Sequence, residues 1–209
     1  MRLNRERLPL VVEGIPFIII PALLTALAAL WGKLYLFVPF LALTIFMCAF
    51  FRNPRRRIPR GEGLIMSPAD GRIVVVDKEA QGTKVSIFMS VFNCHVNRAP
   101  AAGRITEVRY QPGKFMPASK GEASLQNEQN ALKLQGAKGL TMRFVQVAGI
   151  LARRIVCYVH SGDQVQRGEI FGTILFGSRV DVYLPRRVAV RVQVGERVKG
   201  GKSVLGVIK

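Results

Sequence analysis

Pro68-Ala-Asp-Gly-Arg-Ile73 recurs as Pro100-Ala-Ala-Gly-Arg-Ile105, and each copy opens onto a run of residues suited to a strand. A second pair of related motifs follows, Gly162-Asp-Gln-Val-Gln-Arg-Gly168 and Gly195-Glu-Arg-Val-Lys-Gly-Gly201. Glycine and acidic residues in such patterns are typical of the tight turns of a twisted sheet. The repeated motifs therefore predict a fold made of β-hairpins.

The chain after Arg60 alternates short β-branched segments with glycine and proline, at spacings typical of all-β folds. The Gly-acid-x-Val turn resembles the hairpin turn of lipoyl- and biotinyl-like sandwich barrels. We expect a mainly β, compact, sandwich- or barrel-like domain over residues 52–209, in which lipoyl-like hairpins recur. The predicted strands are Arg72–Asp77, Lys84–Met89, Arg104–Tyr110, Ala131–Leu134, Leu140–Val147, Arg153–Val159, Glu169–Leu175, Arg179–Tyr183, Val188–Val192 and Ser203–Ile208.

Residues 8–51 are almost wholly apolar, with Glu13 and Lys33 as their only charges. A Gly-Lys pair divides them into Ile15–Trp31 and Leu34–Phe51. Each segment is at the short end of the roughly 17–25 residues that span a bilayer as a helix. The pattern predicts an N-terminal α-helical membrane hairpin.

Two alternatives to a spanning hairpin stay open. Pro16 and Pro21 are expected to break the first segment near its start, which favours a re-entrant or shallow hairpin. A buried hairpin in a soluble protein is the other alternative, although so many uncharged residues are hard to cover in a small domain. We expect residues 1–51 to anchor the chain in the cell inner membrane with residues 52–209 on the cytoplasmic face, because arginines flank both ends. These are Arg2, Arg5, Arg7, Arg52, Arg55, Arg56, Arg57 and Arg60.

The net charge of +18 is concentrated on residues 52–209, which hold 27 of the 31 Lys and Arg and 11 of the 13 Asp and Glu. Such a surface attracts polyanions. One Trp and four Tyr without aromatic-basic interleaving argue against nucleic acid, so we expect an anionic lipid surface as partner. Three cysteines without a CxxC favour a reducing compartment, with no disulfide framework and no metal site.

The chain contains one Gly-Ser pair, Gly177-Ser178, at the start of a predicted strand. Glycine leaves its carbonyl open to the serine hydroxyl and tolerates the strained backbone that an acyl shift requires. If the bond breaks with elimination, the serine becomes a pyruvoyl group. No cofactor motif occurs elsewhere in the sequence, so an electron sink would have to come from the chain itself.

Four motifs stand in a specific order along the chain. They are Ser67-Pro-Ala-Asp-Gly-Arg-Ile73, Phe88-Met-Ser-Val-Phe-Asn-Cys-His-Val-Asn-Arg-Ala-Pro100, Asn127-Glu-Gln-Asn130 and Gly177-Ser178. In this order they resemble phosphatidylserine decarboxylase proenzymes, most closely the short bacterial and archaeal form, from about Phe51 onward. The resemblance implies self-cleavage into residues 1–177, the β chain, and 178–209, the α chain, which stay together as a heterodimer. It leaves homo-oligomerisation open.

The resemblance also assigns roles to residues. It implies that Asp70 orients His95, and that His95 takes the proton from Ser178. Glu128 and Asn130 match the family's Asn-Glu-x-Asn element and are expected to bind substrate near the site.

One position departs from the longer bacterial members, which carry a second histidine where this chain has Arg98. It stays open whether His95 serves both processing and decarboxylation, and whether Arg98 holds the substrate phosphate or carboxylate.

The implied function is decarboxylation of phosphatidylserine to phosphatidylethanolamine, with the pyruvoyl group from Ser178 as a Schiff-base electron sink. The alternative is a non-enzymatic, membrane-tethered β-barrel that binds anionic lipid or an acidic partner. The state of the bond between Gly177 and Ser178 separates the two, because a binding module remains one chain.

Overall fold

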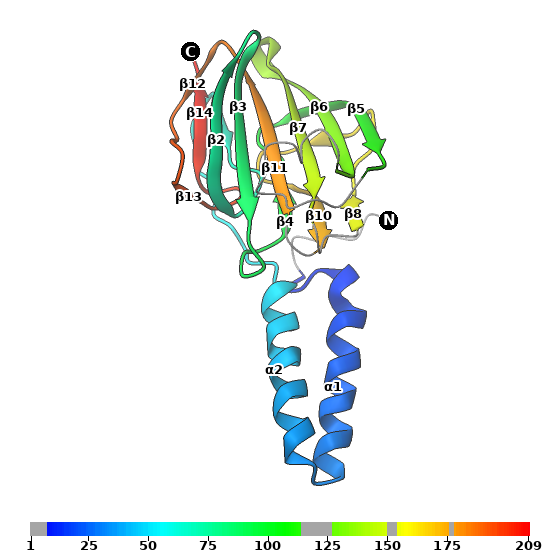
Figure 1. Ribbon diagram of the computed structural model, residues 1–209. Helices are drawn as coiled ribbons and strands as arrows, with labels where there is room; N and C mark the ends of the chain where they lie inside the picture. The colour runs from blue at the N-terminus through cyan, green and yellow to red at the C-terminus, as the bar shows by residue number, and fades with distance from the viewer. Residues whose placement is uncertain (1–7, 114–126, 150–153, 176–177) are drawn as a thin grey trace. The chain divides into compact units, whose positions relative to one another are not determined.

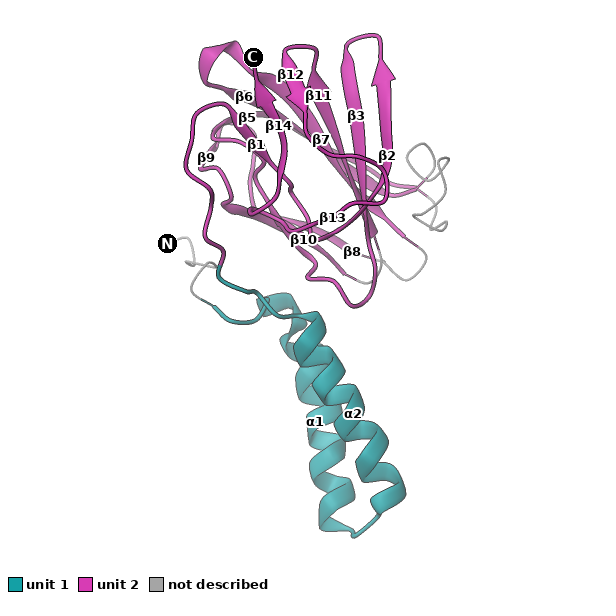
Figure 2. Ribbon diagram, turned by 90° about the vertical axis from the view of Figure 1, so that its left-hand side faces the viewer, with its two compact units in different colours: residues 1–55 teal, residues 56–209 magenta. Residues whose placement is uncertain are grey.

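The computed structural model describes residues 8–113, 127–149, 154–175 and 178–209 (Figure 1). Some of the predicted features lie outside these residues. They are Gly177, the arginines Arg2, Arg5 and Arg7, and the first residue of the strand predicted from Arg153. The chain divides into two compact units, residues 1–55 and residues 56–209 (Figure 2). The predicted division into an anchoring segment, residues 1–51, and a catalytic domain, residues 52–209, assigns a function to each part and stays a prediction.

The first unit is a helical hairpin, as the sequence predicts. A short 3-10 turn, Val12–Gly14, runs into α1 (Ile15–Leu30), and α2 (Leu34–Phe50) returns alongside it. The hydroxyl oxygens of Thr25 and Thr44 lie 3.3 Å apart between the two helices.

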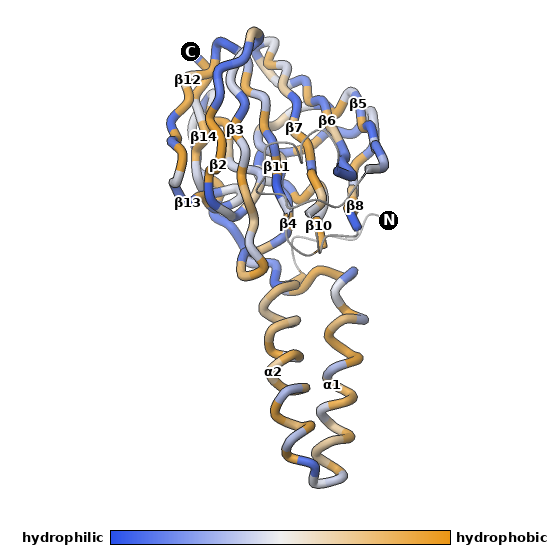
Figure 3. Tube along the Cα trace, in the orientation of Figure 1, coloured by the Kyte–Doolittle hydropathy of each residue, from blue (hydrophilic) through white to orange (hydrophobic). Residues whose placement is uncertain are grey.

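The helices of the hairpin consist mainly of hydrophobic residues (Figure 3), and many of their large apolar side chains are exposed. Ile20 is 60% exposed and Leu30 is 81% exposed. The continuous segment Val12–Leu30 is long and apolar enough to cross a membrane, and Leu34–Phe50 is a shorter apolar helix. An apolar surface of this extent marks the hairpin as a candidate membrane anchor.

The predicted break at Pro16 and Pro21 is wrong, because α1 runs without interruption through both residues. Pro16 lies in the first helical turn, where a backbone N–H has no partner within the helix and its loss is harmless. Pro21 lies inside the helix, and its carbonyl accepts a hydrogen bond of 2.7 Å from the Thr25 hydroxyl. The apolar contact between the two helices keeps α1 continuous despite the missing donor.

The second unit is mainly β. Its eight-stranded antiparallel sheet curls into a half-barrel and has the order β13-β2-β3-β11-β7-β6-β5-β9. Two three-stranded sheets, β1-β14-β12 and β4-β10-β8, complete the domain (Figure 1). The strands are β1 (Leu64–Met66), β2 (Gly71–Glu79), β3 (Gly82–Met89), β4 (Val96–Arg98), β5 (Gly103–Gln111), β6 (Gln129–Gly136), β7 (Thr141–Ala148), β8 (Arg154–Cys157), β9 (Gln164–Val165), β10 (Ile170–Leu175), β11 (Ser178–Pro185), β12 (Val188–Val190), β13 (Arg197–Val198) and β14 (Val204–Ile208).

Each predicted strand has a counterpart in the structure, with ends that differ by a few residues. The strands that the sequence did not predict are β1, β4, β9 and β13, which have two or three residues each. A segment this short shows no alternation of apolar and polar residues, so only its hydrogen bonds identify it.

The core lies between the large sheet and the small sheets. Alternate residues of β11, Val180, Val182 and Leu184, belong to the buried core, as expected when successive side chains point to opposite faces of a sheet. Phe144 of β7 packs edge-to-face on Phe171 of β10, with ring centroids 4.9 Å apart.

The β domain is a pseudo-two-fold repeat. The N–H of Met66 donates to the carbonyl of Pro100, and the N–H of Arg98 donates to the carbonyl of Pro68, both at 2.8 Å. The order of the large sheet reads symmetrically from its two ends, so that β13 corresponds to β9, β2 to β5, β3 to β6 and β11 to β7. The small sheets correspond to each other in the same way.

The recurring sequence motifs lie at equivalent positions in the two halves of this repeat. The strand that begins in the first copy of one motif pairs with the strand from the second copy of the other motif. β2, which begins in the first Pro-Ala-x-Gly-Arg-Ile motif, pairs with β13 from the second glycine turn, and β5 pairs with β9 from the first. Gly162 and Gly195 begin the two turns with φ angles of 98° and 92°, a region that favours glycine. The turn interpretation of these motifs is therefore confirmed.

Candidate functional site

Ser178 is the first residue of β11 and lies between Met89 of β3 and Ala148 of β7. Its side chain is fully buried, and its Oγ has no hydrogen-bond partner among the residues that the structure describes. A buried polar group left in this state costs about 1–3 kcal/mol, so its presence calls for a functional reason. Gly177, the other half of the predicted cleavage site, is outside the described residues.

His95 immediately precedes β4 and is buried, with 2% of its surface exposed. Its Nδ1 lies 3.0 Å from the carbonyl oxygen of Asn93. Its own carbonyl accepts a hydrogen bond of 2.9 Å from the Thr173 hydroxyl on β10. With Nδ1 donating to a carbonyl, the other ring nitrogen, Nε2, carries the lone pair that a general base uses.

Asp70 lies in the turn before β2, where the sequence places it. Its Oδ2 accepts a hydrogen bond of 2.6 Å from Arg56, and its Oδ1 accepts one of 2.7 Å from the N–H of Gly200. Among the described residues these are its polar contacts, and none joins it to His95. The orienting role expected for Asp70 stays a prediction.

Arg98 is the last residue of β4 and is 5% exposed. Its Nη1 donates a hydrogen bond of 3.0 Å to the carbonyl of Gly168. A Cβ built on Gly201 would lie 2.9 Å from the Cδ of Arg98. The guanidinium stem is thus packed against two glycine turns, and its role toward substrate stays a prediction.

The Asn-Glu-x-Asn element borders the strand beside Ser178. The Asn127 amide donates a hydrogen bond of 2.7 Å to the carbonyl of Ala148, the residue opposite Ser178. The Asn130 amide donates to Oε1 of Gln146 at 3.1 Å. Desolvation and the neighbouring carboxylate of Glu128 raise the pKa of Tyr110. Substrate binding by Glu128 and Asn130 stays a prediction.

Cys157 of β8 lies near this element but is not an activated nucleophile. Burial is the main cause that raises the pKa of its thiol above the ordinary value. Its Sγ donates to the carbonyl of Val159 at 3.3 Å. A desolvated neutral thiol is a poor nucleophile.

Gln146 and Asn97 are polar residues of the site that the sequence did not identify. Both are fully buried, and the Gln146 amide donates to Oδ1 of Asn97 at 2.8 Å. The available signal was a glutamine on the inward face of β7, where the other residues, Met142, Phe144 and Ala148, are apolar. This glutamine alone does not indicate its partner, Asn97, which lies on another sheet.

The pseudo-symmetry shows that polar groups gather at one end of the β domain, where they come from both halves of the repeat. The equivalences follow from the matching backbone hydrogen bonds and strand registers of the two halves. The residues Asp70, His95, Asn97, Gln146 and Ser178 correspond in turn to Ala102, Gly63, Ile65, Leu184 and Leu140. Since the same backbone folds with apolar side chains at the equivalent positions of the other end, the polar set is not needed for the fold.

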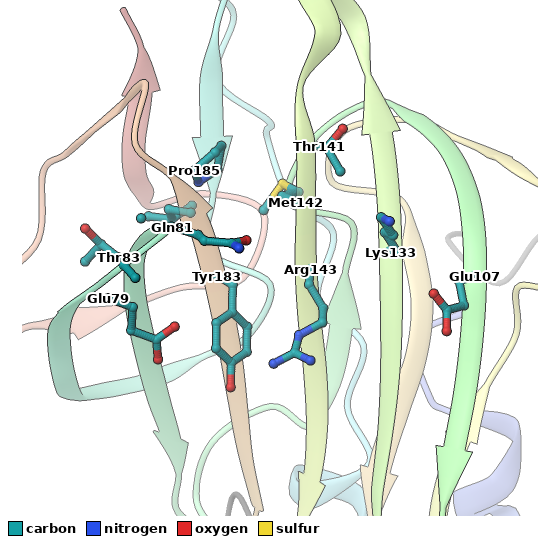
Figure 4. Close-up of a pocket in the computed structure, with 13 residues that line it drawn as sticks. Glu79, Gln81, Thr83, Glu107, Lys133, Thr141, Met142, Arg143, Tyr183 and Pro185 are labelled. Atoms are coloured by element: carbon teal, nitrogen blue, oxygen red, sulfur yellow. The ribbon is translucent and has the colours of Figure 1, made fainter.

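A surface groove of about 760 Å³ is a separate feature of the large sheet (Figure 4). Lys133, Arg143 and Tyr183 line it, and the Arg143 guanidinium carbon lies 4.1 Å from the centroid of the Tyr183 ring. Tyr183 points to the face opposite Ser178, because it stands an odd number of positions along the same strand. None of the predicted site residues lines this groove.

An apolar helical hairpin precedes a two-fold repeated β domain in which a serine and a histidine, Ser178 and His95, are both buried. The sequence profile described as phosphatidylserine decarboxylase matches residues 43–206. The chain belongs to the phosphatidylserine decarboxylase family.

Similar proteins named phosphatidylserine decarboxylase proenzyme occur in several bacteria. The chain is 48% identical to that of Syntrophus aciditrophicus (strain SB), over 93% of this chain and 95% of the relative. It is 43% identical to that of Geotalea uraniireducens (strain Rf4), over 99% and 100%. It is 46% identical to that of Citrifermentans bemidjiense, over 96% and 97%.

Proposed function

We propose that this chain decarboxylates phosphatidylserine to phosphatidylethanolamine, after cleaving itself between Gly177 and Ser178 to make a pyruvoyl group. The observation that carries the proposal is the buried Oγ of Ser178, which has no partner among the described residues. It stands at the polar end of a repeated domain whose equivalent positions at the other end are apolar. Membership of the phosphatidylserine decarboxylase family supports phosphatidylserine as the substrate.

Self-cleavage begins when His95 accepts the proton of Ser178 Oγ, which attacks the carbonyl carbon of Gly177. The C–N bond breaks as the C–O bond forms, and the proton passes to the freed amine, leaving an ester. Loss of the Ser178 Cα proton then expels the Gly177 carboxylate. Water converts the resulting dehydroalanine into a pyruvoyl group and releases ammonia.

The residues around Ser178 fit such a group. After cleavage Ser178 is the first residue of its chain, and it lies between β3 and β7 at the start of strand β11. The pyruvoyl ketone supplies the electron sink for loss of CO₂ from an amino acid head group. In this proposal His95, which is also buried, returns a proton to the product carbon.

The proposal also assigns a membrane location to the hairpin and a side of the membrane to the β domain. The helical hairpin anchors the chain in the cell inner membrane, with arginines at its end and the β domain on the cytoplasmic face. The substrate lies in that membrane, and the basic β domain draws anionic lipid toward the site. The two chains remain associated as a heterodimer.

Intact mass of the purified protein tests the proposal. We expect two chains, residues 1–177 and 178–209, with the smaller lighter by one ammonia than a chain that starts with serine. Ser178→Ala should remain a single chain of 209 residues and should release no CO₂ from carboxyl-labelled phosphatidylserine in vesicles. A single uncleaved wild-type chain would instead support a non-enzymatic lipid-binding module.

A further inference from the structure

Two buried amides link the sheet that holds Ser178 to the sheet that follows His95. The Gln146 amide on β7 donates to Oδ1 of Asn97 on β4 at 2.8 Å. Asn130 on β6 fixes the other end of the Gln146 amide, because it donates to Oε1 at 3.1 Å. Gln146 and Asn97 are fully buried, so water does not compete for these bonds.

Asn97 contacts both strands that flank Ser178. Its Oδ1 accepts from Gln146 on β7, and its Nδ2 lies 3.7 Å from the Sδ of Met89 on β3. Met89 is directly opposite Ser178 in the sheet. Asn97 also follows His95 by two residues, so its position sets that of the histidine backbone.

The opposite end of the domain shows that the fold does not require this polar link. The residues equivalent to Asn97 and Gln146 are Ile65 and Leu184, and both belong to the buried core. Apolar side chains therefore join the two sheets at that end. Buried amides must have all their hydrogen bonds to be tolerated, whereas the apolar pair has no such requirement.

We propose that Gln146 is a positioning residue for self-cleavage, which acts through Asn97 to hold His95 in register with Ser178. This inference rests on the proposed function, because it concerns the same reaction. Gln146 does not touch the reacting atoms in this proposal. It fixes the distance between two sheets, and a displacement of about 1 Å between reacting groups costs about 100-fold in rate.

The test replaces the polar pair by its apolar counterpart. The double variant Asn97→Ile with Gln146→Leu copies the pair at the opposite end of the domain. It also removes the Gln146 acceptor of the Asn130 amide, so its folding is measured by thermal unfolding. We expect it to cleave about 10- to 100-fold more slowly than wild type on a time-resolved gel. Gln135→Met, on the exposed face of β6, is the matched control and should cleave normally.

Thermal unfolding in the Ser178→Ala background separates stability from processing, since no variant cleaves there. An unchanged midpoint together with slow cleavage supports the positioning role. Cleavage of the double variant at the wild-type rate overturns it. Should the double variant fail to fold, Gln146→Met, which keeps the side-chain length, is assayed in its place with the same criterion.

A swap of the two amides gives a readout that mere space filling would not move. Asn97→Gln with Gln146→Asn retains the amide pair and should cleave faster than the apolar double variant. If it is no faster, the hydrogen bond is not what matters and the inference fails.

Treatment with hydroxylamine identifies which step of self-cleavage is slow, because hydroxylamine cleaves the ester formed by the acyl shift rather than the peptide bond. The apolar variant should stay intact in hydroxylamine, since its acyl shift is slow. Rapid splitting at residue 178 would place the defect after the shift and overturn the role. Failure of the wild-type chain to cleave would be a different result, and would refute the proposed function itself.

Discussion

The backbone N–H of Gly200 donates a hydrogen bond of 2.7 Å to Oδ1 of Asp70, across 130 positions of the chain. Asp70 precedes the proposed cleavage bond and Gly200 follows it. The contact therefore joins the two chains that self-cleavage would make. β11 adds to it, because it forms ladders with β3 on one side and β7 on the other.

We expect the chains 1–177 and 178–209 to remain associated after cleavage. The smaller chain contributes a central strand of the large sheet and loses none of its ladder bonds when one peptide bond breaks. Size-exclusion chromatography in native buffer should elute both chains at the position of uncleaved Ser178→Ala. Separation of the smaller chain without denaturant would contradict this expectation.

Arg56→Ala should slow self-cleavage and destabilise the β domain. The Arg56 guanidinium and the Asp70 carboxylate form a mostly buried ion pair at 2.6 Å. Removing the cation leaves the carboxylate with one fewer charged hydrogen bond, which costs about 2 kcal/mol in the free energy of unfolding. Denaturant titration in the Ser178→Ala background measures the loss.

Arg57→Ala is the matched control for Arg56, because Arg57 is exposed and adjacent in sequence. It removes the same charge from the basic segment and should change neither stability nor the rate of cleavage. Equal effects of the two substitutions would mean that net charge, and not the contact with Asp70, is responsible.

His95→Ala should block or greatly slow self-cleavage. A general base contributes about 100- to 10,000-fold, and Arg98 cannot replace it because its guanidinium stays protonated. Arg98→Ala should still cleave but turn over phosphatidylserine poorly. Each variant is scored in parallel for cleavage on a gel and for CO₂ release. Normal cleavage by His95→Ala, together with uncleaved Arg98→Ala, would show that His95 is not the processing base and that Arg98 or its backbone organises the bond that is cleaved.

Deletion of residues 1–51 should release the protein from membranes at high salt. The remaining β domain carries most of the positive charge, so weak binding to anionic vesicles should persist at low salt and vanish as salt screens it. Vesicle sedimentation with anionic and neutral lipid measures both effects. Sedimentation of the truncated chain with neutral lipid at high salt would place the anchor elsewhere.

Local sequence patterns were sufficient for most of the secondary structure. The alternation of β-branched residues with glycine and proline located the longer strands, and the apolar run located both helices. The same reasoning failed at Pro21, because a single missing N–H was outweighed by packing between two apolar helices. It also missed β4, a three-residue strand beside His95 that only its pairing with β10 defines.

The sequence by itself determined a β domain with repeated turns, an apolar hairpin and the motifs that contain Asp70, His95 and Ser178. These features depend on residues that are close along the chain. Only the tertiary structure decided that the repeated motifs pair crosswise, that Asp70 contacts Arg56 and Gly200, and that Gln146 reaches Asn97. The reason is physical: sheet register and crossover between sheets bring distant side chains together, and no local spacing encodes them.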